Sequence, residues 1–287
     1  MKRRTFISLG ARIAAAFASR ISVPAQPTSS RAALVIGVDK AGDLPKLHGA
    51  ASGARQVSDW LRGEGFNVTL FADGDGSVRV NDVYDAVAAI VNRGTTEQLV
   101  VYFAGHGFIS NYSEFWMLSN APGNPNEAVS MRESIELAKA SAIPNVVFIS
   151  DACRSRADSI GTERVRGSLI FPNRSLNPSS VADVDVFLAT LVGDSAFEVP
   201  VSTSAPEYEG IYTRAFLGAF IEPDNSMVRT VNGLLVVPNN HMKAYLEREV
   251  RRRAEAVSIQ LRQVPRAAHG YPDSPEAWIF RAFLGLN

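Results

Sequence analysis

The chain has 287 residues, of which 46% are hydrophobic and 20% are charged, and its formal net charge is zero. This length allows one large globular domain or two small ones. The first 25 residues hold five basic and no acidic side chains, so the remainder is mildly acidic, with 24 basic and 29 acidic residues. An acidic body argues against a nucleic-acid partner. No run approaches the roughly 20 apolar residues that span a bilayer, so stable membrane insertion is not expected.

The N-terminus has the pattern of a targeting segment. Arg3 and Arg4 precede a weakly apolar, Ala-rich stretch, and the small-residue segment Val23-Pro24-Ala25 follows. Twin arginines before such a stretch are typical of the twin-arginine export signal. We therefore expect residues 1–30 to be an export signal and linker, and the protein to be periplasmic or secreted. Because two further arginines interrupt the apolar stretch, the alternative is a basic tail on a cytoplasmic protein.

After this segment, short apolar runs alternate with stretches of helical periodicity. Such alternation predicts an α/β fold with a mostly parallel central sheet and helices on both faces. The polar segment 154–180 interrupts the pattern and is expected to be a long loop. The last helix is expected to turn Glu249 and its charged neighbours to solvent. In chain order, the expected elements are strand 33–38, helix 47–62, strand 66–71, helix 80–91, strand 99–104, helix 131–140, strand 145–150, strand 184–190, helix 212–220, helix 241–257 and strand 277–282.

Two short motifs follow two of the predicted buried strands. Gly105-His106-Gly107 comes after strand 99–104, and Asp151-Ala152-Cys153-Arg154 comes after strand 145–150. Parallel strands can bring such motifs together at one edge of a sheet. There an imidazole can act as base or acid for a thiol nucleophile. Cys153 is the only cysteine, so it forms no internal disulfide. Taken singly, Cys153 fits a small core residue and His106 a turn residue, and only their conjunction indicates catalysis.

The two motifs resemble those of the caspase-like cysteine peptidase superfamily, in its bacterial, metacaspase-like branch. The histidine precedes the cysteine by 47 positions, which agrees with the order and spacing of caspases. The resemblance covers roughly residues 31–285, and the expected peptidase domain is 31–287. Five segments carry it: Ala33-Leu-Val-Ile-Gly37, Val101-Tyr-Phe-Ala-Gly-His-Gly107, Val147-Phe-Ile-Ser-Asp-Ala-Cys-Arg-Ser155, Phe187-Leu-Ala-Thr190 and Gly210-Ile-Tyr-Thr-Arg-Ala-Phe-Leu217.

This resemblance implies a caspase-like three-layer sandwich and a cysteine endopeptidase that acts on protein or peptide substrates. Cys153 is then the nucleophile, His106 the general acid and base, and a thioester acyl-enzyme the intermediate. The backbone N–H groups of Gly107 and Cys153 would form the oxyanion hole. Oxyanion donors of this kind are worth about 2.7–4 kcal/mol each.

The resemblance also implies a substrate preference. Asp151 stands where caspases carry a glutamine, as it does in metacaspases, where the aspartate helps bind an Arg or Lys before the cut. A second pocket aspartate of that family is replaced here by Gly53. Basic specificity is therefore an expectation that rests on one carboxylate, and a different preference at this position is the alternative. Asp151 could instead be a structural carboxylate that caps a helix start.

Three further expectations concern self-cleavage, metal binding and assembly. Family members are often cut in the segment matching 154–180, which implies self-cleavage after Arg164, Arg166 or Arg174, whereas a solvated surface loop is the alternative. The scattered acids of segment 73–82 lack the ligand spacing of a calcium-binding EF-hand loop, so neither a metal nor another cofactor is expected. A homodimer is possible if the sheet edge near the last strand pairs two subunits instead of being covered.

Two other functions compete with the peptidase. A catalytically silent caspase-like module could serve as a binding or scaffold partner, although the usual mark of such a module, loss of the histidine or cysteine, is absent. A different Cys–His enzyme on a doubly wound sheet, such as a thiol acyltransferase, would carry a Gly-x-Ser/Cys-x-Gly elbow. The residues around Cys153 do not form one.

Overall fold

The computed structural model describes most of the chain after the N-terminal segment. The expected export signal lies outside the described residues and stays a prediction. None of the helices in the described part is long and apolar enough to cross a membrane. The described residues are 30–110, 113–153, 155–156, 160–173, 182–190, 198–202, 205–231, 233–257, 265–268 and 278–281.

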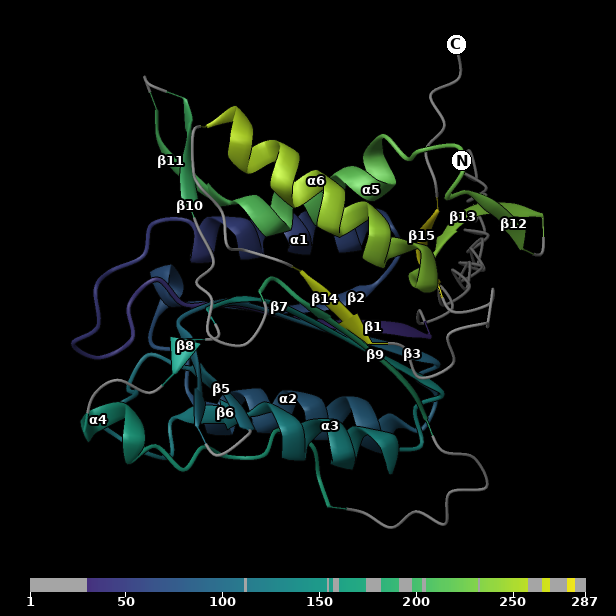
Figure 1. The fold of residues 1–287 in the computed structure, drawn as a ribbon. Helices are drawn as coiled ribbons and strands as arrows, with labels where there is room; N and C mark the ends of the chain where they lie inside the picture. Colours follow the sequence, from purple (N-terminus) through teal and green to yellow (C-terminus); the bar gives the residue numbers. More distant parts are fainter. Residues whose placement is uncertain are drawn as a thin grey trace, which may run out of the picture.

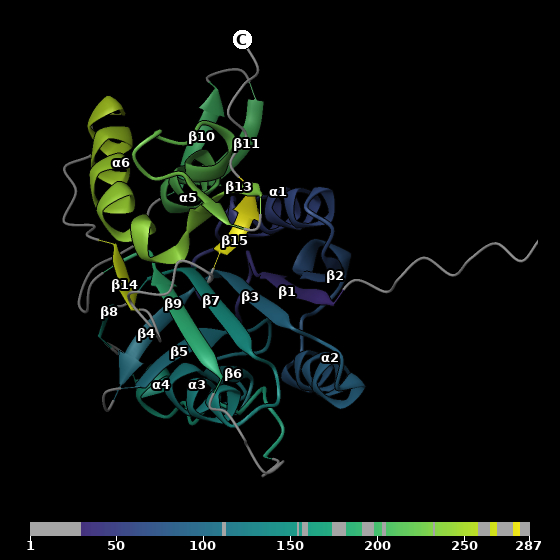
Figure 2. The same ribbon diagram turned by 90° about the vertical axis from the view of Figure 1, so that its right-hand side faces the viewer.

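A six-stranded sheet forms the centre of the fold, with the strand order β14-β9-β7-β3-β1-β2 (Figure 2). Neighbouring strands from β9 to β2 run parallel, and β14 is antiparallel to β9. The mostly parallel sheet predicted from the sequence is therefore confirmed. Its strands are β1 (Arg31–Gly37), β2 (Asn67–Ala72), β3 (Gln98–Gly105), β7 (Asn145–Ala152), β9 (Asp183–Leu188) and β14 (Arg266–Ala268).

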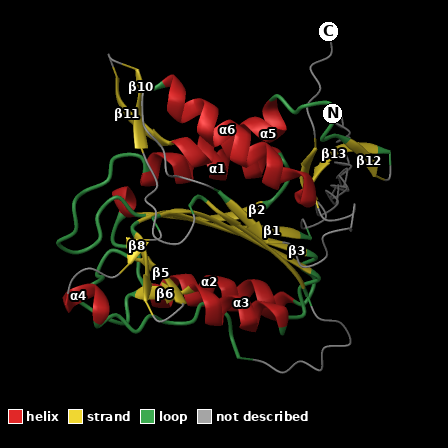
Figure 3. Ribbon diagram, in the orientation of Figure 1, coloured by secondary structure: helices red, strands yellow, loops and turns green. Residues whose placement is uncertain are grey.

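Helices cover both faces of this sheet, which gives three layers (Figures 1 and 3). Along β1, Ala33 and Val35 pack in the core shared with α1, whereas Leu34 and Ile36 pack in the core shared with α2. Both sets are buried because side chains alternate between the faces of a strand. One layer contains α1 (Ala50–Gly63), α5 (Ile211–Ile221) and α6 (Met242–Ala256), and the other contains α2 (Val80–Arg93) and α3 (Met131–Lys139).

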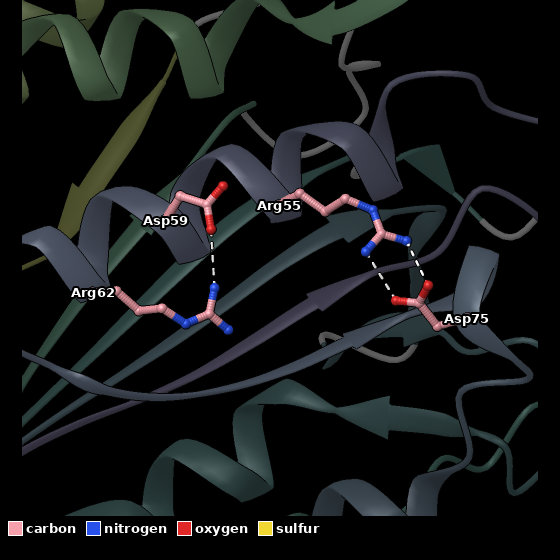
Figure 4. A network of polar contacts seen from close by, with 4 residues as sticks. All are labelled: Arg55, Asp59, Arg62 and Asp75. Atoms are coloured by element: carbon pink, nitrogen blue, oxygen red, sulfur yellow. Dashed lines mark hydrogen bonds and ion pairs between the residues drawn. The ribbon is translucent and has the colours of Figure 1, made fainter.

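Polar contacts fix the position of α1. The helix begins three residues later than predicted, where the Asp39 carboxylate accepts the N–H groups of Ala50 and Ala51 at 2.9 and 3.2 Å. On its outer side, Arg55 donates two hydrogen bonds of 2.9 Å to Asp75 (Figure 4). Asp75 ends the short helix η1 (Asp73–Asp75), which directly follows β2. Because both partners are solvated, this ion pair contributes little to stability, but it ties α1 to the edge of the sheet.

Three smaller sheets were not predicted, because their strands are too short to show a clear period. The one nearest the histidine motif has the order β6-β5-β4-β8, and β4 starts directly after His106. The expected strand 277–282 is present as β15, but it belongs to a separate sheet with the order β12-β13-β15. The unpredicted strands of these three sheets are β4 (Gly107–Ser110), β5 (Ser113–Met117), β6 (Ala128–Ser130), β8 (Ser155–Arg156), β10 (Glu198–Ser202), β11 (Ala205–Gly210), β12 (Arg229–Val231) and β13 (Leu234–Pro238). With β15 (Trp278–Arg281), β12 and β13 form the sheet just described.

The segment 154–180 is more ordered than the predicted loop. Its described part includes β8 and the short helix α4 (Ile160–Glu163), and it buries Ile170 and Phe171 in the core. The N–H groups of Arg166 and Gly167 both donate to the Pro125 carbonyl, at 2.9 and 3.1 Å. The prediction of a long loop was therefore wrong for the described part, where short elements form and apolar residues pack under the sheet. Self-cleavage stays a prediction, and Arg174 lies outside the described residues.

Two further predictions concern the outer elements. The outer edge of β9 is occupied by β14, with Arg266 opposite Leu188 and Ala268 opposite Val186. A homodimer stays a prediction. The placement of Glu249 in solvent was wrong, because the residue is only 9% exposed. It accepts hydrogen bonds from Arg252 at 2.6 and 2.8 Å and lies 2.8 Å from Nε of Arg253.

These contacts predict a pH-dependent contribution of Glu249 to stability. The hydrogen bonds from Arg252 hold the pKa of the Glu249 carboxyl below its ordinary value of 4.5. A depressed pKa stabilises the folded state above the unfolded-state value, and the effect is lost as pH falls through the folded-state value. We expect Glu249→Gln to lower the free energy of unfolding by about 1–2 kcal/mol at pH 7. The difference from wild type should shrink when the pH falls below about 4.

Chemical denaturation of both proteins across this pH range measures the effect. Glu255→Gln is the control, because Glu255 is exposed on the same helix. A difference that is absent at pH 7, or that grows in acid, would contradict the assignment.

Candidate active site

The pairing of β3 with β7 places the two sequence motifs side by side. Gly105 is the register partner of Ala152, and this is the last pair of the two parallel strands. His106 and Cys153 each follow directly, so both lie at the carboxyl edge of the sheet. The two chains stay adjacent beyond it, where Phe108 of β4 pairs with Ser155 of β8. The structure thus places these two residues at the ends of neighbouring strands, on the edge of the sheet where the sequence predicted them.

A backbone carbonyl fixes the imidazole of His106. Its Nε2 lies 2.6 Å from the carbonyl oxygen of Pro45, in the loop between β1 and α1. Because a carbonyl oxygen only accepts hydrogen bonds, Nε2 must carry the hydrogen. In the neutral ring, the basic lone pair is then on Nδ1. Pro45 could not be predicted from the sequence, since any residue can supply a carbonyl oxygen.

Gly107 packs directly against the cysteine segment. A Cβ atom at this position would lie 2.6 Å from the carbonyl oxygen of Cys153 and 3.0 Å from Cβ of Ala152, so only glycine fits. Met117 N–H donates to the carbonyl of His106 at 2.9 Å, which makes Gly107 and Trp116 a non-hydrogen-bonded pair. The N–H of Gly107 therefore points away from β5, on the side where β4 meets β8.

Trp116 anchors the strand that faces Gly107. It is fully buried and stacks on Phe103 of β3, with ring centroids 4.8 Å apart. Its indole N–H donates to Oγ of Ser150 on β7 at 2.9 Å, and Ser150 in turn donates to Glu114 at 3.1 Å. Trp116 therefore fastens β5 to the two strands that carry the motifs. Sequence analysis missed this role, although a tryptophan in a short apolar run was a possible signal.

Asp151 lies on the opposite face of β7, beneath the start of α5. Its side chain is buried, and Oδ2 accepts the hydroxyl of Thr213 at 2.5 Å and the N–H of Thr213 at 3.2 Å. A Cβ at Gly210, the residue before α5, would collide with Oδ2. Asp151 thus satisfies one N–H of the first turn of α5, as the helix-capping alternative predicted. The partial positive charge at the N-terminus of α5 also stabilises the negative charge of Asp151.

A chain of hydroxyl groups extends from Asp151 to β3. Since Thr213 gives its only hydroxyl hydrogen to Asp151, the Tyr102 hydroxyl, 2.6 Å away, must donate to Oγ1 of Thr213. Burial raises the pKa of Tyr102 well above its ordinary value, and the charge of Asp151 raises it further, so this phenol stays neutral.

Gly53 of α1 faces the same cluster. A Cβ there would lie 3.6 Å from the Tyr102 hydroxyl and 3.9 Å from Cγ2 of Thr213. The position considered for a second pocket carboxylate therefore does border the Asp151 cluster, and it contributes no charge. Across the described ranges, no group of three or more His, Cys, Asp or Glu side chains is arranged to hold a metal ion.

Comparisons with known proteins agree with this arrangement. Among solved structures, the chain is similar to caspase-1 of Spodoptera frugiperda, with a TM-score of 0.54 and 14% sequence identity, over 90% of this chain and 93% of that one. It is also similar to a protein of Geobacter sulfurreducens, with a TM-score of 0.52 and 14% identity, over 83% and 92% of the two chains. At this identity the likeness shows the fold alone. A search of curated proteins found no match.

The family model of the caspase domain matches residues 30–268, which is most of the chain. The caspase-like three-layer sandwich expected from the sequence is confirmed by this match and by the shared fold. The chain therefore belongs to the caspase domain family, whose members are cysteine peptidases.

Proposed function

We propose that this protein is a cysteine endopeptidase in which Cys153 is the nucleophile and His106 the general acid and base. The observation that carries the proposal is the β3–β7 register, which ends both strands directly before these two residues. The hydrogen bond from Nε2 of His106 to Pro45 supports it further, because the bond leaves Nδ1 as the basic atom of the ring. Cys153 is partly exposed, so a substrate can reach it.

In the first half of the reaction, Nδ1 of His106 takes the thiol proton, and the Cys153 sulfur attacks the carbonyl carbon of the peptide. The new S–C bond places a negative charge on the carbonyl oxygen. The N–H groups of Gly107 and Cys153 stabilise this oxyanion, and Pro45 stabilises the imidazolium through Nε2–H. The imidazolium then returns its proton to the leaving amine as the C–N bond breaks, which leaves a thioester.

In the second half, His106 takes a proton from water, and the hydroxide oxygen attacks the thioester carbon. The S–C bond breaks, the acid product leaves, and the proton returns to the Cys153 sulfur. Donor and acceptor roles are reversed between the two halves, as expected when one group serves both as acid and as base. The reaction needs no metal or redox partner.

We further propose that the substrate carries Arg or Lys before the scissile bond. Asp151 is two residues from Cys153 and is held in place by Thr213, which supports a role as a fixed negative charge beside the site. A carboxylate pairs with a guanidinium or ammonium through charge-assisted hydrogen bonds. In the competing scaffold function, neither His106 nor Cys153 would be needed, and their retention favours the enzyme.

The catalytic proposal predicts that Cys153→Ala and His106→Ala each lower kcat/KM by about a thousandfold or more, because each removes a group required for attack. The measurement is cleavage of fluorogenic peptides that vary at the residue before the scissile bond. Tyr84→Phe, on the far helix layer, is the folded control. Wild-type cleavage that persists in Cys153→Ala would contradict the proposal. A folded wild type that cuts no peptide would favour the scaffold function.

The specificity proposal predicts the effect of Asp151→Asn. An asparagine keeps an oxygen that can accept the hydrogen bonds of Thr213, but it loses the charge. We expect kcat/KM to fall at least about tenfold for peptides with Arg or Lys before the cut. The same variant should stay folded at the assay temperature, with a slightly lower thermal midpoint because the charge at the start of α5 is lost. Unchanged cleavage after Arg, or wild-type cleavage after Asp, would overturn the role given to Asp151.

A further inference from the structure

One aspartate closes the loop that supplies the Pro45 carbonyl. Asp39 lies two residues after the end of β1, and its backbone carbonyl accepts the N–H of Leu47 at 2.8 Å. Its carboxylate oxygen Oδ1 accepts the N–H groups of Ala50 and Ala51 at 2.9 and 3.2 Å. The main chain and the side chain of one residue therefore bind the loop just after Pro45 and the first turn of α1. The segment between these contacts is a closed loop.

Further hydrogen bonds connect this loop to its surroundings. The N–H of Lys40 donates to Oδ2 of Asp73 in η1 at 2.7 Å. The N–H of Gly42 donates to the carbonyl of Ser119, in the segment after β5, at 3.0 Å. The loop is thus held by α1, by η1 and by the segment after β5. These contacts set the direction in which the Pro45 carbonyl points.

The direction of this carbonyl matters for the imidazole of His106. Nε2 of His106 lies 2.6 Å from the Pro45 oxygen. In a neutral imidazole one nitrogen carries the hydrogen and the other the lone pair, and the hydrogen bond at one nitrogen decides which form is present. If the loop moved, Nε2 would lose its acceptor, and the hydrogen could occupy Nδ1 instead. The ring would then lack a lone pair on the atom that takes the thiol proton.

We infer that Asp39 is a positioning residue for His106: it holds the loop 39–49, and thereby keeps the Pro45 carbonyl on Nε2 and the lone pair on Nδ1. This inference rests on the proposed function. Asp39 acts through the position of its oxygen atoms, because three N–H groups of the loop and of α1 converge on them. Its loss should therefore slow the chemical step more than it weakens substrate binding.

The first test determines which nitrogen of His106 carries the hydrogen and needs no activity. A two-bond ¹⁵N–¹H correlation spectrum of the neutral ring distinguishes the two forms, and Cys153→Ala removes the thiol from the site. We expect the Nε2–H form in Cys153→Ala and a mixture of both forms when Asp39→Ala is added. Adding Asp39→Asn instead should preserve the Nε2–H form, because asparagine and aspartate are similar acceptors at a helix start. The chain has four histidines, so His106→Ala identifies the signals.

The second test measures peptide cleavage in variants of the protein that retain Cys153. We expect Asp39→Ala to lower kcat about ten- to a hundredfold and to change KM less than about twofold. Asp39→Asn should stay within about threefold of wild type. Asp39→Glu keeps the charge but moves the carboxylate by one methylene, so it should resemble Asp39→Ala, and it replaces that variant if the alanine protein does not fold.

Asp59→Ala is the matched control for both tests. Asp59 is an exposed aspartate of α1 whose carboxylate pairs with Arg62 at 3.0 Å, away from the loop (Figure 4). The control should therefore keep the wild-type kcat and the Nε2–H form of His106.

The outcomes separate this inference from the proposed function. An unchanged Nε2–H form and an unchanged kcat in Asp39→Ala or Asp39→Glu overturn the inference, whereas cleavage that depends on Cys153 leaves the proposed function intact. A loss in Asp39→Asn as large as in Asp39→Ala assigns the effect to charge and also overturns the inference, as does a change in KM alone. A wild type that cuts no peptide contradicts the proposed function, and the spectra then decide by themselves whether Asp39 keeps Nε2–H on Pro45.

Discussion

The site depends on one constraint, the parallel register of β3 and β7. With Gly105 opposite Ala152, both strands end at the same level, and the next residue of each is His106 or Cys153. A shift of one residue would move every side chain of β7 to the other face of the sheet. Asp151 would then leave the start of α5. Because both strands are buried and apolar on both faces, burial alone does not distinguish the two registers, and the polar contacts of Ser150 and Asp151 at the end of β7 do.

Two polar networks fix the same edge of the sheet from its opposite faces. On the α2 and α3 side, Ser150 accepts the indole N–H of Trp116 and so holds the strand opposite Gly107. On the α1 and α5 side, Asp151 accepts both groups of Thr213 and so faces the first turn of α5. Neighbouring residues of one strand thus hold separate elements in place, Ser150 the strand opposite Gly107 and Asp151 the start of α5. Buried networks that are well satisfied hold their members in one geometry.

The sequence predicted the parts of this arrangement that depend on long apolar runs. Strands β3 and β7 and their motifs were located correctly because each run is uniformly hydrophobic and ends in polar or glycine residues. The sequence could not predict the role of the Pro45 carbonyl, which has no side-chain signature. Nor could it predict the hydrogen bond between Tyr102 and Thr213, which joins residues 111 positions apart. Strands of two to five residues, such as β4 and β5, carry too few positions to show a period. Glu249 was misplaced because a charged residue was assumed to face water.

The proposed mechanism requires that His106 activates the Cys153 sulfur. Since Cys153 is the only cysteine, iodoacetamide reports on this thiol with no background from others. The decisive measurement is the rate of alkylation near pH 6.5 in the folded wild type and in folded His106→Ala. A thiolate favoured by the imidazolium predicts a wild-type rate at least about tenfold higher. Equal alkylation rates in the two folded proteins would show that His106 does not activate Cys153, and would contradict the proposed mechanism.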